Sequence, residues 1–207
     1  MNLRVNMTSS WRKSSTTGRG CRTNLRIILT DGLSRPFCSE WREGVHVERA
    51  YSDESKARQD LQTAPMNVYT YLDGRILHDP GGCLVRLSRE AQERFEGYRC
   101  PERERARLAY WLASAQEKLN GALVAGDMLK AAYVASTTTW PIMEGLWAAS
   151  DRPTPPNSSV RPHLGDLRAG PPDVSTRYET LFLGDAQERV QTAIEIISWI
   201  VGRLEDG

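Results

Sequence analysis

The stretch VYTYLDGRILHDPGG, residues 68–82, decides how the fold is interpreted. Its aromatic and β-branched residues favour a strand over residues 68–72. Asp73-Gly74 is the pattern of a type I′ hairpin turn, because glycine adopts positive φ at no steric cost. The strand resumes at Ile76-Leu77, and Asp79-Pro80-Gly81-Gly82 ends it. We therefore predict the last edge of a small sheet here, directly before a helical region.

Upstream of this edge, the sequence predicts two strands and one helix. LRIILT (25–30) favours a short strand, and GVHVERAY (44–51) favours a longer one. Alternation along the second strand places Val45, Val47 and Arg49 on one face and His46, Glu48 and Ala50 on the other. A helix should follow at SDESKARQDL (52–61), with Ser52 or Asp53 as its N-cap.

Downstream, the apolar residues recur at helical spacing. One helix should open at Pro101, and Gly126-Asp127 should end it. The next should be kinked or restarted at Pro141, because proline lacks the N–H that continues a helix. Shorter helical stretches precede and follow these two, and the last helix has a capping-box spacing at Asp185 and Glu188.

These elements define an α+β fold class, a partial mixed β-sheet followed by a four- or five-helix bundle. We expect an atypical, disordered head over 1–38, a partial sheet domain over 39–82 and a helical bundle over 83–207. Disorder is expected in particular over 1–24, where few apolar residues are available for burial.

Charge is unevenly distributed along the chain. Residues 1–38 carry seven basic residues and one acid, which leaves 20 basic and 25 acidic residues for 39–207. A basic head can bind nucleic acid through salt-sensitive phosphate contacts, but without interleaved aromatics we expect no nucleic-acid partner. The four cysteines show no zinc-site spacing, and no apolar run approaches the ~18 residues of a membrane span. We expect a cytoplasmic protein without a membrane partner.

Glu48 is the carboxylate with the strongest catalytic potential. The chain has no Walker A loop, no G-x-G-x-x-G, no H-E-x-x-H and no G-x-S-x-G. A strand carboxylate beside other carboxylates can hold Mg²⁺ and, through it, the phosphates of a nucleotide. Glu48 has no D-x-D partner before it, so a solvent-facing strand residue is the alternative interpretation.

The stretch STTTWPIMEGLWAASDRPTPP (136–156) suggests a ligand cleft. Trp140, Trp147 and the nearby Tyr133 are candidate cleft-lining aromatics, although aromatics at helical spacing are also typical of a core. Glu144 and Asp151 are candidate general bases for a substrate hydroxyl, and solvated surface acids are the alternative.

Three stretches carry a resemblance to a known family, NVYTYLDGRILHDPGG (67–82), PERERARLAYWL (101–112) and AAYVASTTTWPIMEGLWAASDRPTPP (131–156). Together they resemble the C-terminal part of bacterial nucleotidyltransferase-domain proteins, relatives of the aminoglycoside nucleotidyltransferases in the polymerase-β-like superfamily. The resemblance spans roughly residues 41–205. In that family a sheet-based palm carries G-S and then D-x-D, a third carboxylate lies on a later strand, and a helical domain follows.

The resemblance implies transfer of a nucleoside monophosphate from an NTP to a small-molecule hydroxyl, with two Mg²⁺ ions aligning nucleophile and leaving group. Glu48 is the position that matches the third carboxylate, as a catalytic and metal-binding residue. G-S and D-x-D are absent, so we expect a truncated palm, impaired catalysis, and Mg²⁺ and NTP as cofactors only if the chain is active. The alternative is a non-catalytic helical binding module for a small molecule or a partner protein, with exposed apolar faces suited to a homodimer.

Overall fold

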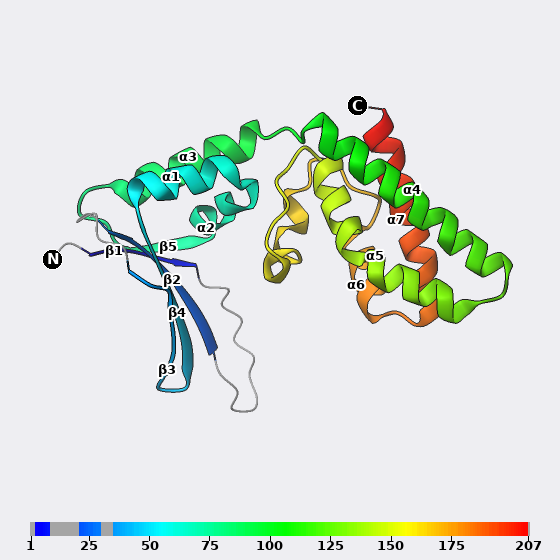
Figure 1. Ribbon diagram of the computed structural model, residues 1–207, viewed down its shortest axis with the longest axis horizontal. Coiled ribbons are helices and arrows are strands. Elements are labelled where there is room, and N and C mark those ends of the chain that lie inside the picture. Colours follow the sequence, from blue (N-terminus) through cyan, green and yellow to red (C-terminus); the bar gives the residue numbers. More distant parts are fainter. Residues whose placement is uncertain (1–2, 9–20, 30–34, 207) are drawn as a thin grey trace. The chain divides into compact units, whose positions relative to one another are not determined.

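The computed structural model describes residues 3–8, 21–29 and 35–206 (Figure 1). The chain divides into two compact units, 1–97 and 98–207. The first holds a mixed sheet with helices and the second holds a helical bundle, so the α+β fold class is confirmed.

Five strands of the first unit form one mixed sheet in the order β3-β4-β2-β1-β5. β2 and β4 pair in parallel, and the other three pairs are antiparallel. The strands are β1 (Leu3–Thr8), β2 (Cys21–Leu29), β3 (Cys38–Arg42), β4 (Val45–Asp53) and β5 (Gly74–His78).

The two-residue hairpin turn of this sheet lies between β3 and β4. Arg42 pairs with Val45, and the two residues between them, Glu43 and Gly44, have φ of 49° and 79°. Positive φ at both central positions is the mark of a type I′ turn, whose twist matches that of the flanking strands. Asp73-Gly74 does not form the expected hairpin, because β5 pairs with the distant β1.

Three helices cover one face of the sheet: α1 (Glu54–Thr63), α2 (Val68–Leu72) and α3 (Cys83–Gly97). Figure 1 shows them gathered on one side of the strands. Asp53 caps α1 by accepting a hydrogen bond from the backbone N–H of Lys56 at 2.7 Å. Ile28 of β2 packs with these helices in the core of the unit, together with Ala57, Leu61, Val68, Tyr69, Tyr71, Cys83, Leu84, Leu87 and Ala91.

Three expectations from the sequence differ from the structure in this unit. Residues 68–72 form helix α2 rather than a strand, because a helical turn lets Val68, Tyr69 and Tyr71 all reach the same core. Disorder through residue 24 does not hold for Leu3–Thr8, which pairs with β2. The helical domain expected over 83–207 starts later, at residue 98, because α3 packs within the sheet unit.

The second unit is a bundle of four α-helices, as expected. They are α4 (Glu102–Val124), α5 (Met128–Ala149), α6 (Val174–Leu183) and α7 (Ala186–Glu205), with short 3-10 turns at Asn157–Ser159 and Pro162–Asp166. Gly126 has a φ of 68° and separates α4 from α5, and the capping box of Asp185 and Glu188 is present at α7. Among the described residues, no helix is long and apolar enough to cross a membrane.

α5 continues through Pro141 instead of restarting there. The three preceding threonines hydrogen-bond to backbone carbonyls one turn back, Thr137 to Tyr133, Thr138 to Val134 and Thr139 to Ala135. Gly145, one turn later, lies against the two neighbouring helices: a Cβ there would be 2.8 Å from Leu112 of α4 and from Ile200 of α7. The three long helices therefore approach closely at Gly145, where any larger residue would force these side chains to shift.

Candidate functional site

Glu48 lies on the helix-facing side of the sheet, in the middle of β4. β4 pairs in parallel with β2, and Glu48 is directly opposite Asn24. Since side chains alternate along a strand, Arg26 is on the same face two residues further along β2. On the other neighbour, β3, Ser39 is opposite Glu48. The groups that the sheet places beside this carboxylate are thus an amide, a guanidinium and a hydroxyl.

A hydroxyl–imidazole pair and an aromatic pair complete this face of the sheet. Ser39 Oγ and His46 Nε2 lie 2.8 Å apart, within hydrogen-bond distance. The Trp41 ring packs on the same imidazole, with ring centroids 5.1 Å apart. Trp41 is 65% exposed, so the edge of this face is open to solvent within the described part of the chain.

The residues around Glu48 do not fit a pair of magnesium ions. Mg²⁺ prefers carboxylate and other oxygen ligands, and the positive charge of Arg26 on the same face opposes a second positive charge. Within residues 3–8, 21–29 and 35–206, no group of three or more His, Cys, Asp or Glu side chains is placed to hold a metal. Asp31 lies outside the described residues.

Arg26 also acts on the helices above the sheet. Burial raises the pKa of Tyr71 to about 12, and the nearby charge of Arg26 opposes that rise. The Tyr71 hydroxyl is buried and has no hydrogen-bond partner among the described residues, and the same holds for Ser52 Oγ at the end of β4. The helix-facing side of β2 and β4 therefore changes from polar and open around Glu48 to buried near Ser52.

The five residues expected to line a cleft in the helical unit differ in burial and in their contacts. Trp147 is fully buried in the core, whereas Tyr133, on the same helix, is 68% exposed. Two of the five lie together: Trp140 Nε1–H donates a hydrogen bond to Glu144 Oε1 at 3.1 Å. The two candidate bases, Glu144 and Asp151, lie in different elements: Glu144 is on α5 and Asp151 is in the loop that follows it.

Asp151 ties the start of α4 to the end of α5. Its Oδ1 accepts a hydrogen bond from the backbone N–H of Cys100 at 3.0 Å, and Arg105 Nη1 lies 3.6 Å away. Its φ of 49° is in the left-handed region, which Asp tolerates better than most residues. These contacts give the carboxylate a structural role between α4 and α5.

Glu144 instead belongs to a charged cluster that the sequence analysis missed. Arg107 of α4 donates to Glu104 at 3.0 Å, lies 3.5 Å from Glu144 and sits 5.7 Å above the ring of Trp111. The hydrogen bond from Arg107 lowers the pKa of Glu104. Residue spacing on α4 gives the i, i+3 pair of Glu104 and Arg107. The contact with α5 depends on how the two helices are aligned, which no local pattern shows.

A small polar cavity lies beside this cluster. Its volume is about 60 Å³, the space of one or two water molecules. Burial raises the pKa of the Cys100 thiol to about 11 and that of Tyr98 to about 12. These two residues line the cavity with Glu104, Leu108, Glu144, Ala148, Arg152 and Thr154.

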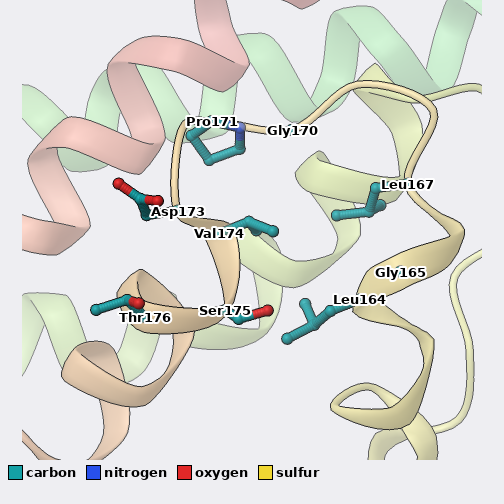
Figure 2. Close-up of a pocket in the computed structure, with 9 residues that line it drawn as sticks. All are labelled: Leu164, Gly165, Leu167, Gly170, Pro171, Asp173, Val174, Ser175 and Thr176. Carbon is teal, nitrogen blue, oxygen red and sulfur yellow. The ribbon is translucent and has the colours of Figure 1, made fainter.

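A larger hollow of about 460 Å³ opens beside the first turn of α6. Figure 2 shows Leu164, Leu167 and Ser175 pointing toward one another across it, with Val174 and Pro171 on its rim. Volumes of this order are typical of small-molecule pockets, and mixed apolar and hydroxyl walls are usual for them. The loop that forms most of the hollow carries none of the predicted cleft residues.

No family model and no curated protein matches the chain. Among solved structures, the chain is similar to one described as a nucleotidyltransferase-like protein from Exiguobacterium sibiricum 255-15. The TM-score is 0.45 at 14% sequence identity, and the likeness covers 97% of this chain and 68% of that chain. A TM-score below 0.5 does not establish a shared fold, so the function must be inferred from the residues of this chain.

Proposed function

We propose that this chain is a nucleotidyltransferase-family protein whose sheet unit is impaired in nucleotidyl transfer. The resemblance of residues 67–82, 101–112 and 131–156 to that family supports the family assignment, as does the observed order of a mixed sheet followed by a helical bundle. The reaction of such a family transfers a nucleoside monophosphate from an NTP to a small-molecule hydroxyl.

One observation carries the impairment: the β2 residues on the face of Glu48 are Asn24 and Arg26. One residue separates them, which is the spacing of the D-x-D motif, so we assign them to the positions where that motif would meet a third carboxylate. An amide is a weaker ligand for Mg²⁺ than a carboxylate, and a guanidinium cannot be a ligand at all. Among these three positions on β2 and β4, only Glu48 is a carboxylate.

The test restores the missing acids. We expect the purified full chain to show no Mg²⁺-dependent incorporation of labelled NMP above that of Glu48→Gln. We expect the double variant Asn24→Asp/Arg26→Asp to gain Mg²⁺ binding by calorimetry, because it places three carboxylates on one face. Glu93→Gln, an exposed acid on α3, is the matched control.

Two results would overturn parts of this proposal. Mg²⁺-dependent transfer by the unmodified chain that is lost in Glu48→Gln, and retained in Glu93→Gln, would show a working active site. Failure of the folded double variant to bind Mg²⁺ would show that Glu48 does not occupy the third-carboxylate position. Circular dichroism separates this failure from simple unfolding.

A second candidate function is a non-catalytic helical binding module for a small molecule. The observation that favours it is the hollow beside α6 (Figure 2), whose size suits a small ligand. Ser175 is an exposed residue on its wall, and Ser175→Trp should fill it without disturbing the core. Ligands found by thermal shift with the full chain should be lost in Ser175→Trp and kept in Glu48→Gln. The opposite pattern would place ligand binding in the sheet unit.

A further inference from the structure

β3 is the end strand of the sheet on the side of β4. Within the described residues, no strand pairs with its outer side. Edge strands of this kind are usually short, charged or covered, since their free N–H and C=O groups are templates for another strand. β3 is short, yet it presents the large side chain of Trp41, which is 65% exposed.

The turn after β3 determines which of its backbone groups point outward. In a two-residue hairpin the residues that flank the turn, here Arg42 and Val45, form a hydrogen-bonded pair. Because the ladder alternates, Glu40 and Cys38 also direct their N–H and C=O groups to β4, whereas Trp41 and Ser39 direct theirs away from it. A further strand would therefore bond to Trp41 and Ser39.

The side chains of β3 are complementary to a second copy of the same strand. In an antiparallel pair related by a two-fold axis at Trp41, the two Trp41 residues lie opposite each other. Glu40 then lies opposite Arg42 of the partner subunit, and Arg42 opposite Glu40 of the partner subunit, so both charged positions meet the opposite sign. If the axis passed through Glu40 instead, two glutamates would face each other, which is unfavourable.

We propose that β3 pairs antiparallel with β3 of a second copy, about a two-fold axis at Trp41, to form a homodimer with a continuous sheet. The aromatic rings then form a row, with each Trp41 stacked on its own His46, at 5.1 Å between centroids, and next to the Trp41 of the partner subunit. Ser39, one of the two residues with outward backbone groups, lies opposite Glu48 on β4, but the inference does not depend on the proposed transferase relationship.

The charged residues of β3 form ion pairs within one chain, on the face of the sheet opposite Trp41. Glu40 accepts a hydrogen bond from Arg42 at 2.7 Å and is also bonded by Arg49, on the face of the sheet opposite Trp41. The hydrogen bond from Arg42 lowers the pKa of Glu40, so the carboxylate is ionised at neutral pH. With the exposed Glu43, each copy brings two acids and two arginines to the interface, and the charges balance.

The experiment is sedimentation velocity of the full chain over a range of concentrations. In the proposed dimer, position 40 of each copy lies opposite position 42 of the other copy. Glu40→Arg alone therefore creates two Arg–Arg pairs, and Arg42→Glu alone creates two Glu–Glu pairs. We expect each to raise the dimer dissociation constant about tenfold or more. An equimolar mixture of the two variants should form a heterodimer with near-original affinity, because every charged position again meets its opposite.

Trp41→Pro is a second, independent variant. The N–H of Trp41 points away from β4, so proline there removes an outward donor while the ladder to β4 is kept. We expect a folded monomer by circular dichroism and sedimentation. Tyr110→Lys, at a position 81% exposed on α4, should leave the dimer unchanged.

Three outcomes overturn the proposal. They are a monomeric chain at all concentrations, a dimer that survives both charge reversals, and a dimer lost in Tyr110→Lys but kept in Trp41→Pro. The last of these would assign the dimer to the apolar faces of the helical bundle.

Discussion

The two units of this protein use their polar residues in opposite ways. In the bundle, the acids and aromatics of the 136–156 stretch are largely used in packing: Trp147 is buried and Asp151 links α4 to α5. In the sheet unit, β4 is only half-buried along most of its length, and His46 and Glu48 remain on a partly open face. The distinctive stretch 136–156 therefore supplies packing contacts in the bundle. β4, which has no distinctive motif, carries the more accessible polar groups of the sheet unit.

The largest expected effect comes from the buried tryptophan. Trp147→Ala should lower the free energy of unfolding by about 3–5 kcal/mol, because it removes a fully buried side chain and leaves a cavity. Trp111→Ala on α4, half-exposed, is the matched control and should cost far less. Urea denaturation of both variants measures the difference. Equal losses would mean that Trp147 does not differ from a surface aromatic and would reopen its assignment to a ligand cleft.

Gly145→Ala tests how closely the three long helices approach. The added Cβ would meet Leu112 and Ile200 at 2.8 Å, and such overpacking costs about 1–3 kcal/mol. Gly121→Ala on α4 is the control, because no atom lies within 4 Å of its Cβ position. Alanine should stabilise that helix by about 0.4–1 kcal/mol. Two changes of the same sign in thermal unfolding would contradict the packing described for Gly145.

Asp151 should behave as a structural residue. Asp151→Ala leaves the N–H of Cys100 without its acceptor and should cost about 1–3 kcal/mol. Asp151→Asn keeps an acceptor oxygen and tolerates the left-handed backbone, so it should recover most of the loss. Urea midpoints of the two variants make the comparison. A ligand-binding defect in Asp151→Asn at unchanged stability would instead support a role on a substrate.

Local patterns predicted the helices well and the sheet poorly. Each of the helix features depends on residues that are close together in the sequence. These features are the caps at Asp53 and Asp185, the break at Gly126 and the apolar stripes of α4 and α7. β1 was missed, because its pairing with β2 depends on residues that are distant in sequence. Four of the residues 68–72 are aromatic or β-branched, which favours a strand, and the segment is too short for periodicity to distinguish a strand from a helix.

In the candidate sites too, sequence spacing predicts contacts within one element and does not predict contacts between elements. Alternation correctly placed Glu48 and His46 on one face of β4, but the identity of its neighbour Asn24 required the strand order. In the bundle, Trp140 and Glu144 are four residues apart on one helix, a spacing that allows their hydrogen bond. Such spacing did not reveal that Arg107 would meet Glu144 from α4, since that contact depends on the alignment of two helices.

Alkaline pH should destabilise each unit through one tyrosine. Burial raises the pKa of Tyr71 in the sheet unit and of Tyr98 in the bundle to about 12, above the ordinary value of 10.0. The folded state then holds more protons between pH 10 and 12. Stability is therefore unaffected below pH 10 and falls as pH rises through this window, by at most about 1.4 kcal/mol per pH unit for each group.

The matched variants are Tyr71→Phe and Tyr98→Phe, each measured by urea unfolding at pH 8 and pH 11. Each should reduce the alkaline loss. At pH 8, Tyr71→Phe should be neutral or stabilising, because its hydroxyl is buried without a partner, whereas Tyr98→Phe loses its hydrogen bond to Cys100. An alkaline loss that persists unchanged in both variants would show that these phenols do not cause it.

The smallest predicted effect compares one helix cap from each unit. Asp53 accepts from the N–H of Lys56 at the start of α1, and Asp185 accepts from the N–H of Glu188 at the start of α7. Replacing either residue with alanine should cost about 1 kcal/mol. In α7 the Glu188 side chain also accepts from the backbone N–H of Asp185, at 3.0 Å, so the capping box is reciprocal.

Hydrogen exchange at the first-turn amides of both helices separates these two cases. Asp53→Ala should speed exchange in α1 and leave α7 unchanged, and Asp185→Ala should do the reverse, because a cap acts on its own first turn. Asp185→Asn retains an acceptor and should restore protection in α7. Faster exchange throughout both helices in either variant would mean that the caps support global stability instead of a local turn. The two units would then not differ in how their helices begin, even though they differ in how their polar residues are used.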